Sequence, residues 1–454
     1  IVLLKAGDAR IPVSAIDIFS KNYLLMSTLC GRRVIRVVNA KEKKDEILGA
    51  GGNGTDRLWL RVDFLTSRNK VETERVFVKL PAPTILERIF LTIFGVYLNE
   101  IKFYKRLMED DAFRNKFPLG LFPATLAVGR NRNRFVLVLE DLQGRKDAVL
   151  PTIATAHPIF QVKRVLRALA ELHAPYFAFP LHSQQDQGYL GWTDVWSRSQ
   201  IKSTRPPFLR MIAHFSLKGI DRRFPHLLSK DCRMAYSLFV DNFQTIRALW
   251  SSHPHLTLTH GDSHLGNCFF YGDRCGFYDW QCVALEHPCR DIVYHLLSSC
   301  DPTDLEAGGE KFLVEFYVQQ LNDCLAKKLG KPIEVGNDQA NKLTTEEAWE
   351  QYRLHSVWVL VAFVICAGAG DHYFTDSMAK LTLTRIIKGC DRLDTLSALK
   401  LLLARNSRRS SFSSPPQKQI FDDDDEKDKK RIFSARRYSD QRRVGGSNFP
   451  HLSP

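Results

Sequence analysis

One short segment, residues 260–281, restricts the possible folds and activities of this chain more than any other part of the sequence. Its first half, HGDSHLGN, places Asp262 five residues before Asn267. The apolar run CFFY then favours a strand, and the following Gly-Asp pair favours a hairpin turn. The returning strand, GFYDWQ, carries Asp279. We therefore expect two carboxylates and one amide to lie close together.

These side chains are the ones that phosphoryl transfer from ATP requires. A carboxylate must accept the proton of the attacking hydroxyl, and oxygen ligands must hold the metal ion on the phosphates. The kinase catalytic loop supplies an Asp, an Asn five positions later, and a second Asp on the following hairpin. Each piece alone is also an ordinary turn or loop sequence, so the order and the spacing carry the prediction.

Residues 257–296 resemble the catalytic core of the aminoglycoside phosphotransferase and choline kinase-like superfamily, especially its ecdysteroid kinase-like branch. Gly261 replaces the Arg of eukaryotic protein kinases, and Trp-Gln stands where those enzymes have Phe-Gly. The resemblance implies that Asp262 is the catalytic base and that Asn267 and Asp279 bind Mg²⁺. It also implies an α+β, bilobal protein-kinase-like fold, with a small antiparallel-sheet N-lobe and a larger, mostly helical C-lobe.

Two charged residues upstream are expected to form an ion pair. The apolar run at residues 76–80 contains Lys79 and predicts a buried strand. Helical periodicity at residues 85–109 includes Glu100. By the resemblance, Lys79 contacts the α- and β-phosphates and Glu100 holds it in place. A solvated surface pair is the alternative, which the apolar setting of both residues disfavours.

Two segments are candidates for further nucleotide contacts. Glycines at residues 49–54 permit close backbone approach to phosphate, which makes Gly52 and Asn53 candidates, although a flexible hairpin turn fits equally well. A predicted apolar strand later runs into Glu140-Asp141-Leu142. By the resemblance, backbone groups of Glu140 and Leu142 meet the adenine edge.

Length and composition fit two lobes and a tail. The 454 residues, 44% of them hydrophobic, suffice for a large core. We predict an N-terminal extension (1–48), an ATP-binding N-lobe (49–142), a C-lobe (143–404) and a disordered charged tail (405–454). Helices are expected at residues 160–174, 234–250, 311–329, 346–367 and 377–403. The apolar stretch 357–369 is too short to span a bilayer, and no signal peptide is visible, so neither is predicted.

Two residues outside the catalytic segment are assigned supporting roles. Asp291, in HPCRDIVYHL, matches a family Asp that caps and orients the helix after the site, and a plain helix N-cap plays the same physical part. His173 lies near the end of a predicted helix. A satisfied core or cap histidine is preferred there to a residue that supports the catalytic loop.

Cysteine spacing and charge argue against zinc and nucleic acid. Cys268, Cys275, Cys282 and Cys289 recur every seven residues, whereas structural zinc sites use closely paired ligands. We predict reduced thiols in a cytoplasmic protein. The net charge is +14, but the basic residues are dispersed and form no stripe with aromatic residues, so no nucleic-acid partner is expected.

The tail has its own composition. Residues 405–454 contain twelve Lys/Arg and seven Asp/Glu, a net charge of +5 (12 − 7), and few apolar residues. Such a segment buries too little surface to offset its ordering entropy. The strings RRSS and RRYS resemble sites for basophilic protein kinases, which makes the tail a candidate substrate for them.

The expected reaction is ATP- and Mg²⁺-dependent transfer of the γ-phosphate to a hydroxyl of a small molecule. Asp279 is only twelve residues before Asp291, which leaves no room for a peptide-docking platform. Trp192, Trp196 and Phe208 are candidates for the acceptor pocket, with ordinary core packing preferred. A choline-like cation and a lipophilic alcohol both stay open. A catalytically silent kinase-fold scaffold and a protein kinase are the alternative functions.

Overall fold

The computed structural model describes residues 11–14, 17–18, 28–29, 32–39, 55–66, 68–82, 84–85, 88, 96–132, 134–145, 147–178, 206–329, 342–370 and 374–412. Its contacts divide the chain into two units, Ile1–Leu403 and Ala404–Pro454. The second unit is described only through residue 412, where it forms the end of a helix. Disorder and phosphorylation of the tail therefore stay predictions.

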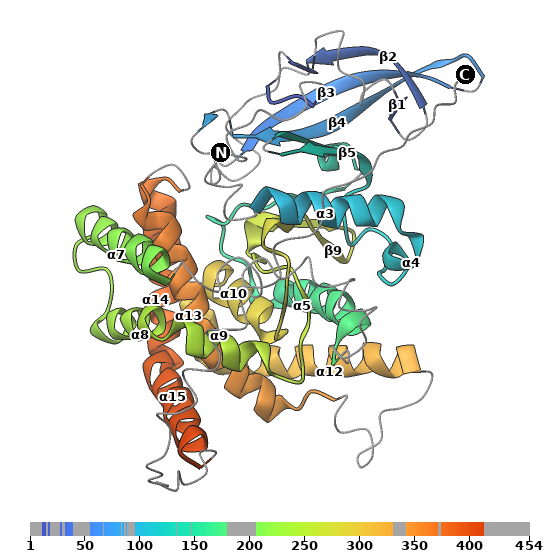
Figure 1. The fold of residues 1–454 in the computed structure, drawn as a ribbon. Helices are drawn as coiled ribbons and strands as arrows, with labels where there is room; N and C mark the ends of the chain where they lie inside the picture. The colour runs from blue at the N-terminus through green and yellow to red at the C-terminus, as the bar shows by residue number, and fades with distance from the viewer. Residues whose placement is uncertain are drawn as a thin grey trace, which may run out of the picture. The chain divides into compact units, whose positions relative to one another are not determined.

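The N-terminal part of the first unit is a six-stranded antiparallel sheet with strand order β1-β2-β3-β4-β6-β5 (Figure 1). The strands are β1 (Thr28–Leu29), β2 (Arg32–Asn39), β3 (Thr55–Leu65), β4 (Val71–Pro81), β5 (Thr125–Asn131) and β6 (Arg134–Glu140). Side chains of β4 alternate between the two faces. Val76, Val78 and Leu80 fill the core on one face. Phe77 and Lys79 therefore face the opposite side, where they line a pocket.

Helix α3 (Val96–Glu109) connects the sheet with the rest of the unit. It packs against β5 and against the 3₁₀ turn Trp280–Cys282, and Figure 1 shows it between the sheet and the larger helices. The ring of Phe103 stacks on Trp280 with 4.2 Å between centroids. The helix predicted at residues 85–109 is described continuously only from Val96, and Glu100 lies in its first turns.

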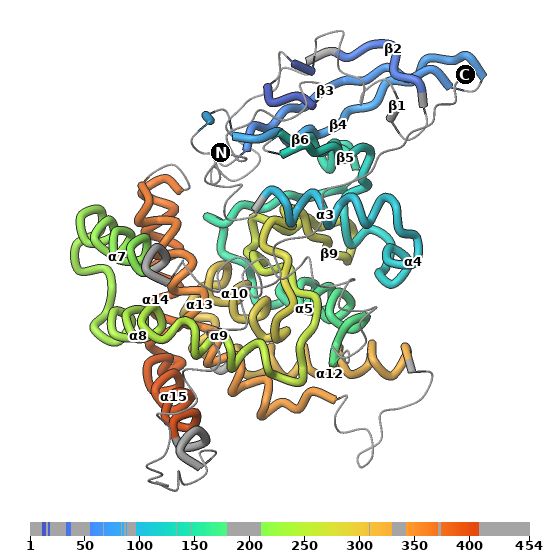
Figure 2. Tube along the Cα trace, viewed as in Figure 1, coloured from blue at the N-terminus to red at the C-terminus, as the bar shows by residue number. Residues whose placement is uncertain are grey.

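The remainder is mostly helical, and Figure 2 traces it from α5 to α15. The helices named below are α5 (Ile159–His173), α7 (Pro206–Arg223), α8 (Lys230–Asp241), α9 (Phe243–Ser251), α10 (Cys289–Ser299), α12 (Glu310–Leu329), α13 (Thr345–Gly368), α14 (Asp376–Arg392) and α15 (Thr395–Phe412). Two antiparallel strand pairs also belong to it: β7 (Thr257–Thr259) with β10 (Ala284–Glu286), and β8 (Cys268–Tyr271) with β9 (Arg274–Phe277). The predicted α+β, bilobal kinase-like fold is confirmed.

Two predicted helices are each broken in two. The helix predicted at residues 234–250 ends and restarts at Asn242, whose side-chain amide donates to the carbonyl of Leu238 at 2.9 Å. The helix predicted at residues 377–403 breaks at Asp394, which has φ of 50°. Asn and Asp adopt non-helical backbone more readily than most residues, because their short side chains bond locally to the main chain.

Helix α13 corrects the statement that the apolar stretch at residues 357–369 is too short for a membrane. The stretch lies in a 24-residue helix that is long and apolar enough to cross one, by length and composition alone. Within its most apolar window, 61% is buried inside the protein. The core helix of a globular fold passes the same test, and α13 packs against α7, α10 and α14.

Glycine permits the close crossing of α13 and α7. A Cβ on Gly368 would lie 2.1 Å from the carbonyl oxygen of Ser216. A Cβ on Gly219 would in turn lie 2.2 Å from the carbonyl oxygen of Gly368. Because these obstacles are backbone atoms, any larger residue would push the two helices apart.

Candidate active site

The loop between β7 and β8 carries the predicted base and depends on a glycine. Gly261 has φ of +81°, a left-handed conformation that L side chains rarely adopt. An added Cβ would lie 2.1 Å from the carbonyl oxygen of Cys282. The chain therefore needs glycine immediately before Asp262, for both backbone angle and space.

Helix α10 holds this loop through one of its faces. Residues 291, 295 and 299 are four apart, so they project from the same side of the helix. The Asp291 carboxylate accepts the backbone N–H of His260 at 2.6 Å and of Gly261 at 2.8 Å. His295 Nδ1 lies 2.8 Å from the carbonyl of Ser263. The hydroxyl of Ser299 accepts from the N–H of Leu265 at 2.9 Å.

Asp291 is not the helix N-cap that was predicted. The N-cap of α10 is Pro288, and Asp291 is the third residue of the helix. His173 Nε2 lies 3.1 Å from Asp291, and the other ring nitrogen lies 2.7 Å from the hydroxyl of Tyr317. His173 is thus both a satisfied core histidine and a support for the loop. Burial opposes ionisation of Asp291, but its bond to His173 and the neighbouring charges lower its pKa.

Asn267 orients the predicted base. Its amide nitrogen donates to the backbone carbonyl of Asp262 at 2.8 Å and to the Asp262 carboxylate at 3.1 Å. With its NH₂ group committed to Asp262, the amide oxygen of Asn267 is directed elsewhere and is the atom that can ligate a cation. The side chain of Asp262 keeps 15% of its surface exposed, enough to meet a substrate hydroxyl.

Lys79 and Glu100 form the predicted ion pair, and Asp279 joins it, which was not predicted. Lys79 Nζ lies 2.8 Å from each carboxylate oxygen of Glu100 and 2.9 Å from Asp279 Oδ1. Lys79 is 3% exposed and Glu100 is 2% exposed, which rules out the solvated surface pair. Burial alone would lower the pKa of Lys79, but Asp279 and Glu100 raise it. Burial also raises the pKa of Glu100.

The backbone at Asp279 is itself unusual. Asp279 has φ of 65° and ψ of 64°, left-handed for a residue with a side chain. Such geometry costs of order 1–3 kcal/mol and persists where the surrounding structure imposes it. Burial opposes ionisation of Asp279, but Lys79 and Arg57 lower its pKa. The carboxylate is therefore held charged at the end of the β8–β9 hairpin.

A pocket with about 560 Å³ of empty space opens beside this ion pair. Its apolar lining comes from Trp59, Phe77, Pro123, Leu139, Leu142 and Leu150, and its charged lining includes Arg57, Lys79 and Asp279. Apolar walls with a few charged groups are typical of small-molecule sites. The predicted Glu140 and Leu142 both line this pocket.

The side chain of Glu140 is already engaged. It accepts the N–H of Ala124 at 2.7 Å and pairs with Arg145 at 2.6 Å. The adenine contact assigned to Glu140 and Leu142 stays a prediction about their backbone groups. Gly52 and Asn53 lie outside the described residues, as do Trp192, Trp196 and the side chain of Phe208.

Two residues that the sequence analysis did not select also belong to the site. Arg57 Nη2 lies 3.8 Å from Asp279 Oδ2. Tyr294 lies one helical turn from Asp291, and burial together with the charge of Asp262 raises its pKa well above the usual range. Helical periodicity from Asp291 could have revealed Tyr294. Arg57 could be selected only once the register of β3 with β4 was known.

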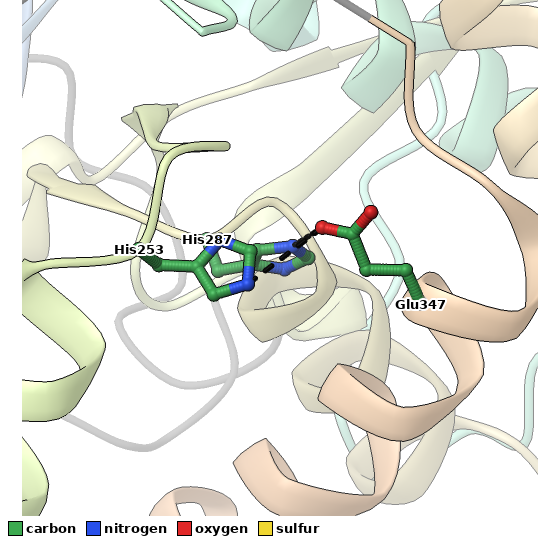
Figure 3. Close-up of side chains that lie close together, drawn as sticks. All are labelled: His253, His287 and Glu347. Atoms are coloured by element: carbon green, nitrogen blue, oxygen red, sulfur yellow. Dashed lines mark ion pairs between the residues drawn. The ribbon is translucent and has the colours of Figure 1, made fainter. Parts of the chain in front are cut away.

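A second polar cluster lies away from this pocket, where His253, His287 and Glu347 converge (Figure 3). Their ligand-type atoms lie within 4.8 Å of one another. His253 Nδ1 accepts the N–H of His255, and His287 Nδ1 accepts the N–H of Cys289, each at 3.2 Å. In a neutral ring the proton then sits on Nε2, the atom that faces Glu347.

This proton position disfavours a metal ion in the cluster. A metal would need a lone pair on each Nε2 and a hydrogen-bond acceptor beside each Nδ1. His255 Nδ1 also lies 2.5 Å from Glu347 Oε1. We interpret the cluster as Glu347 bonded to His255, with the Nε2 atoms of His253 and His287 at 3.6 and 4.0 Å. It connects the first turn of α13 with the chain beside β7 and β10.

Comparison with known proteins identifies the family. The model of the ecdysteroid kinase-like family matches residues 57–330, more than half of the chain. The chain belongs to the ecdysteroid kinase-like family. The match begins at Arg57 and includes Lys79, Glu100 and the whole catalytic segment. A search of curated proteins gave no match.

Solved structures with a similar arrangement are distant in sequence. Choline kinase from Cryptosporidium parvum Iowa II is 11% identical, with coverage of 82% of this chain and 91% of that one and a TM-score of 0.41. Ethanolamine kinase from Plasmodium vivax is 13% identical, with coverage of 76% and 82% and a TM-score of 0.40. Aminoglycoside phosphotransferase from Alicyclobacillus acidocaldarius is 11% identical, with coverage of 81% and 93% and a TM-score of 0.36. At these values they carry no argument about activity or substrate here.

Proposed function

We propose that this protein transfers the γ-phosphate of MgATP to a hydroxyl group of a small molecule. The observation that carries the proposal is the arrangement of five side chains from three separate regions. Asn267 orients Asp262 on the catalytic loop, while Lys79 bridges Glu100 and Asp279. A base, a metal-ligand pair and a phosphate-binding lysine are the parts that this reaction needs.

The residues present fit Mg²⁺ and the phosphates of ATP. Asn267 and Asp279 offer only oxygen ligands, which Mg²⁺ prefers. Mg²⁺ held there would neutralise charge on the β- and γ-phosphates. Lys79 would donate to phosphate oxygens from a position that Glu100 fixes. A nucleotide base could pack against the apolar lining, which includes Phe77 and Leu139.

Asp262 would supply general-base catalysis. Its carboxylate accepts the proton of the substrate hydroxyl while the hydroxyl oxygen bonds to the γ-phosphorus, and the bond to the ADP oxygen breaks. The bond from Asn267 keeps the carboxylate in one orientation. Because α10 holds four backbone groups of the loop, little movement of Asp262 is needed at the moment of transfer.

A small acceptor fits the short connection after the metal-ligand Asp. Helix α10 begins at Cys289, and the connection contains only a 3₁₀ turn and strand β10. It holds no segment of the length that docks a peptide in protein kinases. We further propose a cytoplasmic location, which the nine free thiols of the described residues support.

The test is ATP consumption by the purified protein with Mg²⁺ and a panel of small hydroxyl compounds. We expect acceptor-dependent turnover that falls by about 10²- to 10⁴-fold in Asp262→Asn, with MgATP binding retained. Asp273→Asn, in the exposed turn of the neighbouring hairpin, is the matched control and should keep full activity. MgATP binding without turnover on any acceptor would favour the scaffold alternative. Labelling of protein in place of small alcohols would favour a protein kinase.

A further inference from the structure

Arg57 stands directly beside Lys79 in the sheet. In the pairing of β3 with β4, Arg57 is the partner of Lys79, and Trp59 is the partner of Phe77. Partner residues of an antiparallel pair project from the same face. All four side chains accordingly line the same pocket. The sheet thus presents two cations side by side above the proposed phosphate site.

Both cations face one carboxylate. Lys79 lies 2.9 Å from Asp279 Oδ1, and Arg57 lies 3.8 Å from Asp279 Oδ2. The Arg57 contact is long, and its side chain is 23% exposed against 4% for Lys79. Among the described residues, Asp279 is the acidic partner of the Arg57 guanidinium. Arg57 is therefore the looser and more accessible of the two cations.

Metal binding would change the role of Arg57. Lys79 and Arg57 face two carboxyl groups, Glu100 and Asp279. A metal-bound triphosphate brings further negative charge, and Asp279 then acts as a metal ligand. A guanidinium binds phosphate through two parallel N–H bonds, which a partly exposed and weakly held Arg57 is free to make.

We propose that Arg57 is a phosphate-binding residue that exchanges Asp279 for the β- or γ-phosphate of MgATP. This assignment rests on the proposed function, because it supposes that the pocket binds MgATP. It differs from a simpler role in which Arg57 only neutralises Asp279. In that simpler role, removal of the arginine would free Asp279 for the metal and strengthen nucleotide binding. A phosphate contact requires the opposite sign.

Calorimetric titration with Mg²⁺ and AMP, ADP or ATP distinguishes the two roles. For Arg57→Gln we expect the affinity for MgATP to fall by about tenfold or more, as for loss of a charge-assisted hydrogen bond. AMP affinity should stay unchanged. A loss of affinity for both ADP and ATP would show that Arg57 contacts the β-phosphate. A loss of affinity for ATP alone would show that it contacts the γ-phosphate. The affinity of Arg57→Lys for MgATP should lie between those of Arg57→Gln and wild type.

Arg61→Gln is the matched control. Arg61 is exposed, lies four residues along the same strand, and does not line the pocket. The substitution removes the same charge and should leave all three affinities unchanged. An Arg57→Gln protein that binds MgATP as tightly as wild type, or tighter, would overturn the assignment. So would an equal loss for AMP. A wild-type protein that binds no nucleotide would instead overturn the proposed function, and this assignment with it.

Discussion

Asp291→Asn is the perturbation whose effect the structure defines most closely. The two oxygens of Asp291 accept two backbone N–H groups of the catalytic loop, at 2.6 and 2.8 Å, and one oxygen also meets His173 at 3.1 Å. Asp291, His173 and the two loop residues that donate to Asp291 are all buried. An amide has the same shape but keeps only one acceptor oxygen, while its NH₂ group can only donate.

Either orientation of the amide leaves a loop N–H without an acceptor. If the oxygen faces Gly261, the N–H of His260 loses its partner, and the reverse orientation loses the bond to Gly261. A buried donor left unsatisfied costs about 1–3 kcal/mol. We therefore expect Asp291→Asn to lower the free energy of unfolding by that amount. Turnover should also fall, because the backbone beside Asp262 is no longer fixed.

Chemical denaturation measures this change, with Asp273→Asn as a surface control. The pKa of Asp291 is lowered in the folded state, so its ionised form stabilises the fold above its unfolded pKa of about 3.9. This contribution is lost as pH falls through the lower folded pKa. The difference between wild type and variant should shrink over the same range. A variant within about 0.5 kcal/mol of wild type at pH 7 would refute the inferred role.

Three further outcomes are expected. Gly261→Ala should abolish turnover and destabilise the fold, since the new Cβ meets the carbonyl of Cys282 at 2.1 Å; normal kinetics would contradict the loop geometry. Gly368→Ala should lower the melting temperature without changing nucleotide affinity, because it separates α7 from α13 and neither helix lines the pocket. Acid should destabilise the protein below pH 6.5. Burial lowers the pKa of His157 to about 2 and of His355 to about 3. Each histidine therefore lowers the free energy of unfolding by about 1.4 kcal/mol for every pH unit below 6.5, down to its own folded pKa. His355→Phe preserves the stacking on Trp250. It should make the slope of unfolding free energy against pH shallower by the contribution of one histidine. An unchanged slope would refute the role assigned to His355.

The parts of the site that the sequence predicted are those with short-range signals. The five-residue interval from Asp262 to Asn267 and the hairpin before Asp279 are local patterns. In the structure Asn267 bonds to Asp262, and Asp279 pairs with Lys79. Lys79 and Glu100 lie on a strand and a helix whose periodicity the sequence shows. Their pairing needed the family resemblance, since nothing local relates residues on separate elements.

The parts that the sequence missed depend on contacts between distant segments. His173 lies 118 residues from Asp291, and no local pattern connects them. The role of Asp291 was mistaken because a carboxylate near a helix start normally caps its own helix. Here its two carboxylate oxygens accept hydrogen bonds from a neighbouring loop. The breaks at Asn242 and Asp394 escaped notice because apolar periodicity continues across both.

The two halves of the site differ in how they are held, and this difference explains how nucleotide binding can proceed. The catalytic loop is fixed by neutral and charged hydrogen bonds from a fully buried helix, so Asp262 and Asn267 are in place before any ligand arrives. Asp279 instead faces Lys79 and Arg57, both cations. Those pairs keep a buried carboxylate charged without a metal, and a metal ion can replace them with the same sign of charge. In the proposed reaction, the site would therefore be rigid where the proton is accepted and exchangeable where phosphate and metal enter and leave.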